Sequence, residues 1–285
     1  MIETYVLHIT RQCNMACAYC YESDKNSEYT WDEIKDTIDS IIKYNTEFNL
    51  EFLGGEPCLR VDLIDQTINY LKSKNVKVLS FLITTNGTIV NDLLINILLS
   101  NENVFWFASI DGNKFMNSLR VTKDGYNSYD LVTSNLQKLK KAGVPDGQIN
   151  AHLVTHPYNI AQLTDGVVDL YKQGFRNFGI GTVESTITID EEYCELFVEQ
   201  HKVLSDLIKK EKLPGCSIGS FSWLKPSTDS RFYLRDSTGK LVLETYGRAA
   251  SDIKDTGTYI VHQGGSDVTK LIQGIREAVY HLHNR

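Results

Sequence analysis

The chain has 285 residues, of which 42% are hydrophobic, 10% aromatic and 23% charged, and its formal net charge is −7. These values are ordinary for a globular protein with one large domain, or one domain and an appendage. The acidic balance argues against nucleic-acid binding through bulk electrostatics, and no apolar run approaches the ~20 residues that cross a membrane.

The first two hundred residues alternate apolar runs typical of strands with amphipathic segments typical of helices. Strands are predicted at residues 5–10, 50–54, 77–85, 104–110, 149–155 and 176–181. Helices are predicted at residues 30–44, 61–73, 90–99, 128–142, 160–173 and 191–210. Thr30, with Glu33 three residues later, has the pattern of a capping box at the start of the first helix.

Six βα units with nearly continuous apolar strands predict an α/β fold with a parallel sheet covered by helices. Six units are too few for a closed eight-stranded barrel. A partial (βα)6 TIM-type barrel and an open doubly wound sheet both fit, and periodicity does not decide between them. In either fold, functional residues are expected at the carboxyl ends of the strands.

The pattern changes after about Leu213, where the chain becomes rich in Ser, Gly and Thr. Short β-type runs surround residues 236–240, and residues 267–282 have the pattern of a closing helix. We therefore expect a barrel domain over residues 1–212. A small β-rich C-terminal appendage with a terminal helix should follow over residues 213–285.

Polar, glycine-rich segments follow four successive predicted strands. The first is followed by Cys13, Cys17 and Cys20, and the second by the sequence GGEPC at 54–58. The third runs into TTNGT at 84–88, and the fourth into SIDG at 109–112, with Arg120 shortly beyond. Glycine at such places lets the backbone approach a ligand closely. These segments should therefore share one face of the molecule.

Three of the six cysteines, Cys13, Cys17 and Cys20, lie within eight residues. The N-terminus lacks the pattern of a signal peptide, so we expect a cytoplasmic protein in which clustered thiols bind metal more often than they form disulfides. Three thiolates suit an iron–sulfur cluster. A structural zinc normally has four protein ligands, for which His8, or better Cys58, could be the fourth. The spacing favours a cluster and leaves zinc as an alternative.

The pattern Cys13-x-x-x-Cys17-x-x-Cys20, with Tyr19 before the last cysteine, resembles the signature of radical S-adenosylmethionine (radical SAM) enzymes. LGGEP at 53–57, TTNGT at 84–88 and SIDG at 109–112 resemble further motifs of that family, in the same order. The segment DGYNSYDLVTSNLQKLKKAG at 124–143 is most similar to the branch of sulfatase-maturing and peptide-modifying (SPASM-type) maturases. The resemblance spans roughly residues 5–210.

The resemblance implies one [4Fe-4S] cluster bound by three cysteines, with one iron open to S-adenosylmethionine. Reductive cleavage of S-adenosylmethionine would give a 5′-deoxyadenosyl radical that abstracts hydrogen from a residue of a peptide or protein. Epimerisation, a crosslink or oxidation could result, and a flavodoxin or ferredoxin could supply the electron. The alternatives are a small-molecule or nucleoside substrate, and a zinc-binding interaction protein that is not an enzyme.

Motif positions imply the individual roles. Tyr19 should pack near the adenine, and the GGEP segment should meet the methionine amino group. Ser109 and Arg120 should lie near the methionine carboxylate, and Thr85 and Asn86 near the ribose or substrate. The residues implied in cofactor binding are Tyr19, Gly54, Gly55, Glu56, Pro57, Thr85, Asn86, Ser109 and Arg120. Asp111 should face the cavity as a candidate catalytic residue.

The tail departs from that branch, whose members usually carry a cysteine-rich C-terminal domain with further clusters. Here the tail holds only Cys216, and Cys194 lies on the preceding helix. Two separated thiols do not make a second cluster, so a single cluster is expected. Cys58 and Cys216 are candidate hydrogen donors to a substrate radical, although free cysteines often act as small buried hydrophobic residues.

Overall fold

The computed structural model describes residues 3–20, 22, 25–183, 191–218, 231–235 and 241–245. Its strands are β1 (Glu3–Thr10), β2 (Glu47–Gly54), β3 (Lys77–Thr85), β4 (Val104–Ser109), β5 (Ile149–Thr155), β6 (Asn177–Thr182), β7 (Ser217–Ile218), β8 (Arg231–Arg235) and β9 (Leu241–Thr245). The α-helices are α1 (Trp31–Tyr44), α2 (Val61–Lys72), α3 (Asp92–Ser100), α4 (Tyr129–Ala142), α5 (Leu163–Gln173) and α6 (Glu191–Lys209). Short 3₁₀ helices are η1 (Pro57–Arg60), η2 (Met116–Leu119), η3 (Asp146–Gln148) and η4 (Ile160–Gln162).

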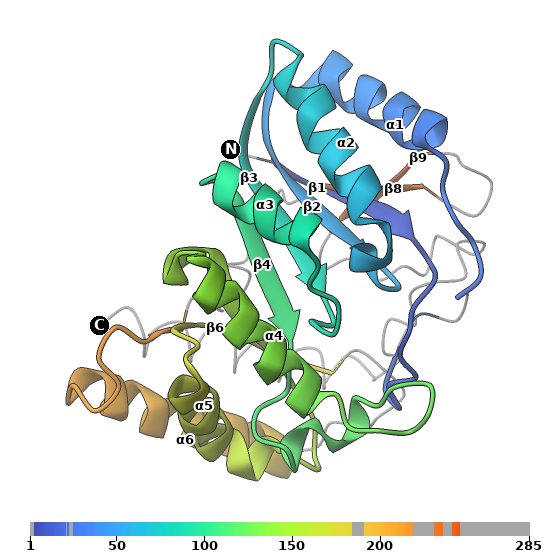
Figure 1. Ribbon diagram of the computed structural model, residues 1–285. Helices are drawn as coiled ribbons and strands as arrows, with labels where there is room; N and C mark the ends of the chain where they lie inside the picture. The colour runs from blue at the N-terminus through green and yellow to red at the C-terminus, as the bar shows by residue number, and fades with distance from the viewer. Residues whose placement is uncertain are drawn as a thin grey trace.

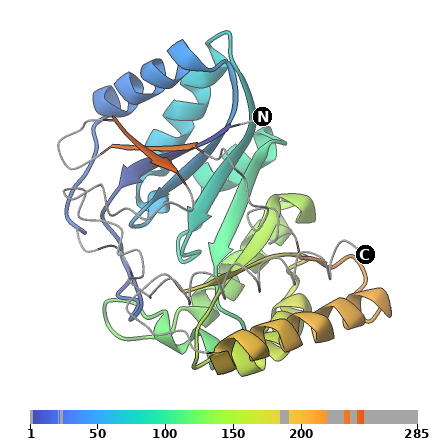
Figure 2. The same cartoon turned by 180° about the vertical axis from the view of Figure 1, so that it is seen from behind.

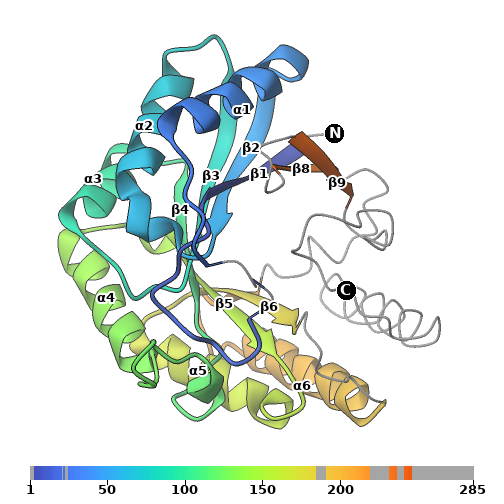
Figure 3. The ribbon, with the colours of Figure 1, turned by 90° about the vertical axis from the view of Figure 1, so that its right-hand side faces the viewer.

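Strands β1 to β7 form one parallel sheet in sequence order. Helices α1 to α5 cover its outer face, and the sheet curves away from them (Figures 1 and 3). Strands β1 and β7 do not pair with each other, so the barrel is open. The structure confirms the partial TIM-type barrel, because a doubly wound sheet would carry helices on both faces.

The predicted elements lie within a few residues of the observed ones. Thr30 caps α1 as expected, because its hydroxyl accepts the Glu33 N–H at 3.3 Å while the Glu33 carboxylate accepts the Thr30 N–H at 2.8 Å. Strand β7 was not predicted, because two residues show no periodicity. It pairs with the start of β6 just beyond residue 212, and the division of the chain into two domains at that point stays a prediction.

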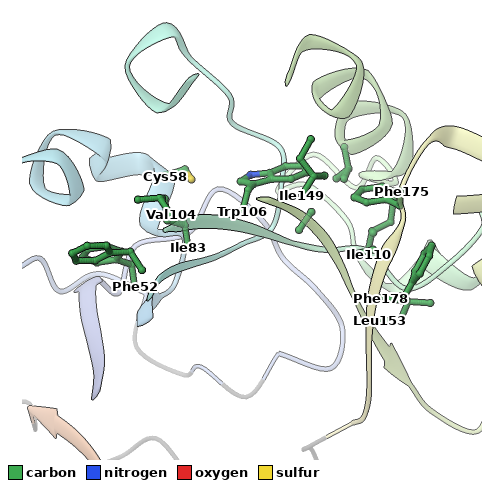
Figure 4. Close-up of a cluster of buried hydrophobic side chains, with 14 of the residues drawn as sticks. Phe52, Cys58, Ile83, Val104, Trp106, Ile110, Ile149, Leu153, Phe175 and Phe178 are labelled. Atoms are coloured by element: carbon green, nitrogen blue, oxygen red, sulfur yellow. The ribbon is translucent and has the colours of Figure 1, made fainter. Parts of the chain in front are cut away.

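Alternation along the strands separates two faces of the sheet. Phe52, Ile83 and Trp106 point toward the helices and are fully buried (Figure 4). Trp106 stacks on Phe175, with ring centroids 6.3 Å apart. The residues between them face the opposite side and are partly buried on β2, β4 and β5. We call that side the inner face.

Beyond β7, the described part of the tail is the antiparallel pair β8–β9, which lies beside β1 (Figures 2 and 3). The pair flanks residues 236–240, around which β-type runs were expected. Those residues and the predicted helix at 267–282 lie outside the described residues. Among the helices that the structure describes, none has the length and apolar character needed to span a bilayer.

Candidate active site

The loop that carries the three cysteines follows β1 and is seated against two glycines at the end of β2. Gly55 N–H donates to the Thr10 carbonyl at 2.9 Å, and Glu56 N–H donates to the Gln12 carbonyl at 2.8 Å. A Cβ atom on Gly55 would lie 2.3 Å from the carbonyl oxygens of both Arg11 and Gln12. The loop can therefore take this path only because residue 55 has no side chain.

The same loop is held from the other side by the segment around Arg120. Ala16 N–H donates to the Val121 carbonyl at 2.8 Å, and Ala18 N–H donates to the Leu119 carbonyl at 2.9 Å. These bonds bring the loop after β1 and the segment after β4 together, as the motif order implied.

Cys13 is buried, Cys17 is partly buried and Cys20 is exposed. Burial raises the pKa of Cys13 and of Cys17, while the nearby Arg120 guanidinium opposes the rise at Cys17. Both Cys13 and Cys20 lie near enough to raise the pKa of Cys17 further. The three thiols thus share one electrostatic environment.

The three thiols do not surround a point where a single metal ion could bind. Within the described part of the chain, no three His, Cys, Asp or Glu side chains stand as a ready metal site. The Cys20 thiol instead faces the Glu22 carbonyl at 3.9 Å. The donor set fits a cluster, because cysteine thiolates are the usual ligands of iron–sulfur clusters.

Glu56 ties the loop after β2 to the loop after β3. Its carboxylate accepts the Cys58 N–H at 2.8 Å, the Thr85 hydroxyl at 2.6 Å and the Asn86 N–H at 2.6 Å. Burial raises the pKa of Glu56, and these three donors oppose the rise. The carboxylate is fully occupied within the protein, so a ligand would meet this segment through its backbone.

Asn86 continues this connection to the cysteine loop. Its amide donates to the Asn14 side chain at 2.8 Å and lies 3.8 Å from the Cys13 sulfur. Asn14 in turn donates to the Thr88 hydroxyl at 2.8 Å. Asn86 therefore lies against the thiol cluster.

Asp111 joins three elements of the site and is 0% exposed. One carboxylate oxygen accepts Arg120 Nε–H at 2.8 Å and Val154 N–H at 3.0 Å, and the other accepts the Tyr19 hydroxyl. Burial raises the pKa of Tyr19 well above its usual value, so its hydroxyl remains a donor. Asn117 accepts the Asp111 N–H at 3.0 Å. Every oxygen of this carboxylate has a partner, which suits a positioning role better than that of a base.

Arg120 uses only its Nε toward Asp111. Its two terminal nitrogens have no protein partner among the described residues, and its guanidinium lies 5.3 Å from the centre of the Tyr19 ring. Two free donors in one plane match a carboxylate. Ser109, at the end of β4, is partly buried and lies in register with His152 of β5.

Cys58 lies in the hydrophobic core, and Cys216 lies at the edge of the sheet opposite the cysteine loop. Cys58 is 2% exposed and packs in the hydrophobic core (Figure 4), and burial raises its pKa well above the usual value. Cys216 immediately precedes β7, whose Ser217 pairs with Asn177 at the start of β6. In a parallel sheet this is the amino edge, opposite the cysteine loop, and the role of Cys216 as a hydrogen donor stays a prediction. The side chain of Cys194 lies outside the described residues.

Two histidines to which the sequence assigned no role lie close to the site. Burial and the Arg120 charge lower the pKa of His152 to about 4. His156 is 1% exposed, with its ring 5.8 Å from that of Tyr19, and its Nδ1 accepts the Tyr158 N–H at 3.2 Å. Its Nε2 has no partner among the described residues. Their only sequence signal was their place on and after the fifth strand.

Comparison with known proteins gives the family. The family model for the radical SAM superfamily matches residues 7–165, which is more than half of the chain. An uncharacterized protein of Methanocaldococcus jannaschii is 28% identical over 144 residues, covering 50% of each chain. A probable GTP 3′,8-cyclase of Methanococcus maripaludis is 36% identical over 92 residues, covering 31% of this chain and 30% of its own.

A radical SAM cyclopropyl synthase, TigE of Paramaledivibacter caminithermalis, is 28% identical over 159 residues, covering 49% of this chain and 33% of its own. The chain thus spans half or less of the length of these curated relatives.

Two solved structures share the fold. One is anSMEcpe with bound AdoMet and Cp18Cys peptide, with a TM-score of 0.67 and 18% identity over 78% of this chain and 64% of that chain. The other is SuiB of Streptococcus suis bound to precursor peptide SuiA, with a TM-score of 0.60 and 15% identity over 76% of this chain and 49% of that chain.

Proposed function

Because the chain belongs to the radical SAM superfamily, whose members bind a [4Fe-4S] cluster and S-adenosylmethionine, we propose that it uses both to modify a residue of a peptide or protein. When bound, these cofactors supply a 5′-deoxyadenosyl radical that takes a hydrogen atom from the substrate. The protein's contribution is to bind, orient and shield them.

Cys13, Cys17 and Cys20 are the proposed cluster ligands. The observation that carries this assignment is the close packing of their loop on Gly55. This packing places the loop at the ends of β1 and β2, next to the backbone of residues 54–57. Backbone groups of Gly54, Gly55, Glu56 and Pro57 are proposed to meet the methionine amino group.

Arg120 is the proposed partner of the methionine carboxylate, because its two terminal nitrogens are free of protein contacts among the described residues. Ser109 would assist it from the end of β4. Tyr19 would lie beside the adenine, and Thr85 and Asn86 would border the ribose. Asp111 keeps Tyr19 and Arg120 in place through its two carboxylate oxygens.

The peptide substrate is supported by the two fold neighbours that were solved with peptides, anSMEcpe and SuiB. The chemical outcome is left open among epimerisation, a crosslink and oxidation. We also propose that residues 213–285 help to cover or hold the substrate, and that a flavodoxin or ferredoxin supplies the electron. A small-molecule or nucleoside substrate is the second candidate, favoured by the likeness to a probable GTP 3′,8-cyclase.

The test begins with anaerobic reconstitution of the full chain and reduction in the presence of S-adenosylmethionine. Release of 5′-deoxyadenosine is expected in the wild-type protein and not in Cys17→Ala. Peptides and nucleoside triphosphates are then added separately, and both 5′-deoxyadenosine and substrate mass are measured. A mass change confined to nucleotides would replace the peptide proposal by the second candidate.

A further inference from the structure

The inner face of the sheet is polar where β2 and β3 run side by side. Phe48, Leu50 and Phe52 of β2 are at most 1% exposed and pack toward the helices, so Asn49 and Glu51 between them face the other way. Leu50 pairs in register with Phe81, which also packs in the core, and this fixes the corresponding inner row on β3.

Hydrogen bonds between the strands confirm that these rows share the inner face. The Ser80 hydroxyl donates to the Asn49 side chain at 2.7 Å, and the Thr84 hydroxyl donates to the Glu51 carboxylate at 2.7 Å. On the next strand, Phe107 pairs in register with Thr84 and is partly buried on the same side. An acid, small polar groups and an aromatic ring thus lie together with Leu82, which pairs in register with Glu51.

The Glu51 carboxylate lacks the basic partner that a carboxylate removed from solvent ordinarily has, as far as the described residues show. Among the described residues it forms no ion pair, and the Thr84 hydroxyl is its one hydrogen-bond donor. Burial raises the pKa of Glu51, and only that hydroxyl opposes the rise. A poorly compensated carboxylate lowers the stability of the fold, so its presence calls for a charge that arrives from outside.

The position of Glu51 suits a contact with the substrate. Glu51 precedes Gly54 by three residues, so it lies about 10 Å below the glycine loop at the strand ends. A group bound there would reach up the inner face toward the cysteine loop. An extended substrate side chain of four or five atoms would span much of the about 10 Å between Glu51 and the glycine loop.

We propose that Glu51 binds a cationic group of the substrate, an ammonium or a guanidinium, on the inner face of the barrel. The cation would donate a charge-assisted hydrogen bond to the Glu51 carboxylate, and the aliphatic stem behind it would pack on Phe107. This inference rests on the proposed function and adds to it a substrate class. Such a group can come from an Arg or Lys side chain of a peptide or from a free amine of a small molecule.

The alternative is that Glu51 is a protonated carboxylic acid whose only role is structural, to hold β2 to β3. Glu51→Gln separates the two, because its side-chain oxygen can still accept from Thr84 while the charge is lost. Glu47→Gln is the matched control on the same strand, since Glu47 is exposed and pairs with Lys77 at 2.8 Å. Glu51→Gln should melt at the same or a higher temperature than the wild type at pH 8. A lower melting temperature would assign Glu51 to the structural role and overturn the proposal.

The binding test uses the full reconstituted chain with S-adenosylmethionine and defined probes. The probes are the capped peptide Gly-Gly-Arg-Gly-Gly, its Lys version, its neutral citrulline version, and agmatine as a small guanidinium. Retention of each probe on the protein is measured by ultrafiltration and mass spectrometry. The wild type and Glu47→Gln should retain the cationic probes at least about tenfold better than the citrulline peptide, and Glu51→Gln should lose that preference.

Retention of the cationic peptides points to a peptide source, and retention of agmatine alone points to a small amine. Equal retention of cationic and neutral probes by the wild type, or an unchanged preference in Glu51→Gln, would overturn the proposal. Release of 5′-deoxyadenosine without added substrate is measured in parallel and should be the same in the wild type and Glu47→Gln. A wild-type protein that releases no 5′-deoxyadenosine would count against the proposed function. The retention data would still show whether Glu51 binds a cationic group.

Discussion

Replacing Gly55 by alanine tests whether the two glycines shape the cysteine loop. The added Cβ would come 2.3 Å from the carbonyl oxygens of Arg11 and Gln12, both backbone atoms that have no room to rotate away. Overpacking of this kind costs about 1–3 kcal/mol. Moving the loop would also weaken the bonds from Gly55 N–H to Thr10 and from Glu56 N–H to Gln12, each worth about 0.5–1.5 kcal/mol.

The total for Gly55→Ala is therefore about 2–6 kcal/mol of unfolding free energy, measured by urea denaturation of the metal-free protein. Iron content after reconstitution should fall with it, because Cys13 directly follows the displaced carbonyls. Gly147→Ala is the control, since a Cβ there meets nothing within 4 Å, and it should change neither quantity. A Gly55→Ala protein with the stability and iron content of Gly147→Ala would show that the cysteine loop does not need glycine at position 55.

Three further substitutions test other parts of the site. Asp111→Asn should lower the unfolding free energy by about 3–5 kcal/mol, because it breaks a buried ion pair with Arg120, and thermal denaturation would measure this. Arg120→Lys should weaken S-adenosylmethionine binding in titration calorimetry by about tenfold or more, because a forked donor is lost; unchanged affinity would remove Arg120 from the carboxylate site. Cys216→Ala and Cys58→Ala should both keep 5′-deoxyadenosine release and product formation, measured by chromatography and mass spectrometry, because Cys58 packs in the core and Cys216 lies at the opposite edge; release without product in either variant would support its role as hydrogen donor.

The alternation of strands and helices can be predicted from the sequence, because each βα unit has its own pattern of apolar residues. The choice of an open barrel over a doubly wound sheet is not, since it depends on where helices pack after the chain has folded. Strand β7 was not predicted, because a strand of two residues shows no hydrophobic alternation. The position of Cys216 at the amino edge could not be predicted for a related reason, because its glycine-rich loop resembles those at the carboxyl edge and only the register of β7 on β6 places it.

Within the site, the sequence indicated which loops meet and left their contacts unknown. The Tyr19–Asp111 bond joins residues 92 positions apart, and no local pattern predicts such a pairing. Glu56 was expected near a ligand, while its side chain turns out to hold Thr85 and Asn86. Motifs fix which residues gather, and packing decides which of them face a ligand and which support the others.

The central claim is that Cys13, Cys17 and Cys20 bind a cluster that serves S-adenosylmethionine cleavage. Its most direct test is 5′-deoxyadenosine release per chain after anaerobic reconstitution and reduction, with iron and sulfide measured on the same samples. The wild type and a Cys58, Cys194 and Cys216 triple alanine variant should bind about four irons and four sulfides and release the nucleoside. Cys17→Ala should do neither. A colourless wild-type protein that binds one zinc ion and releases no 5′-deoxyadenosine would contradict the account.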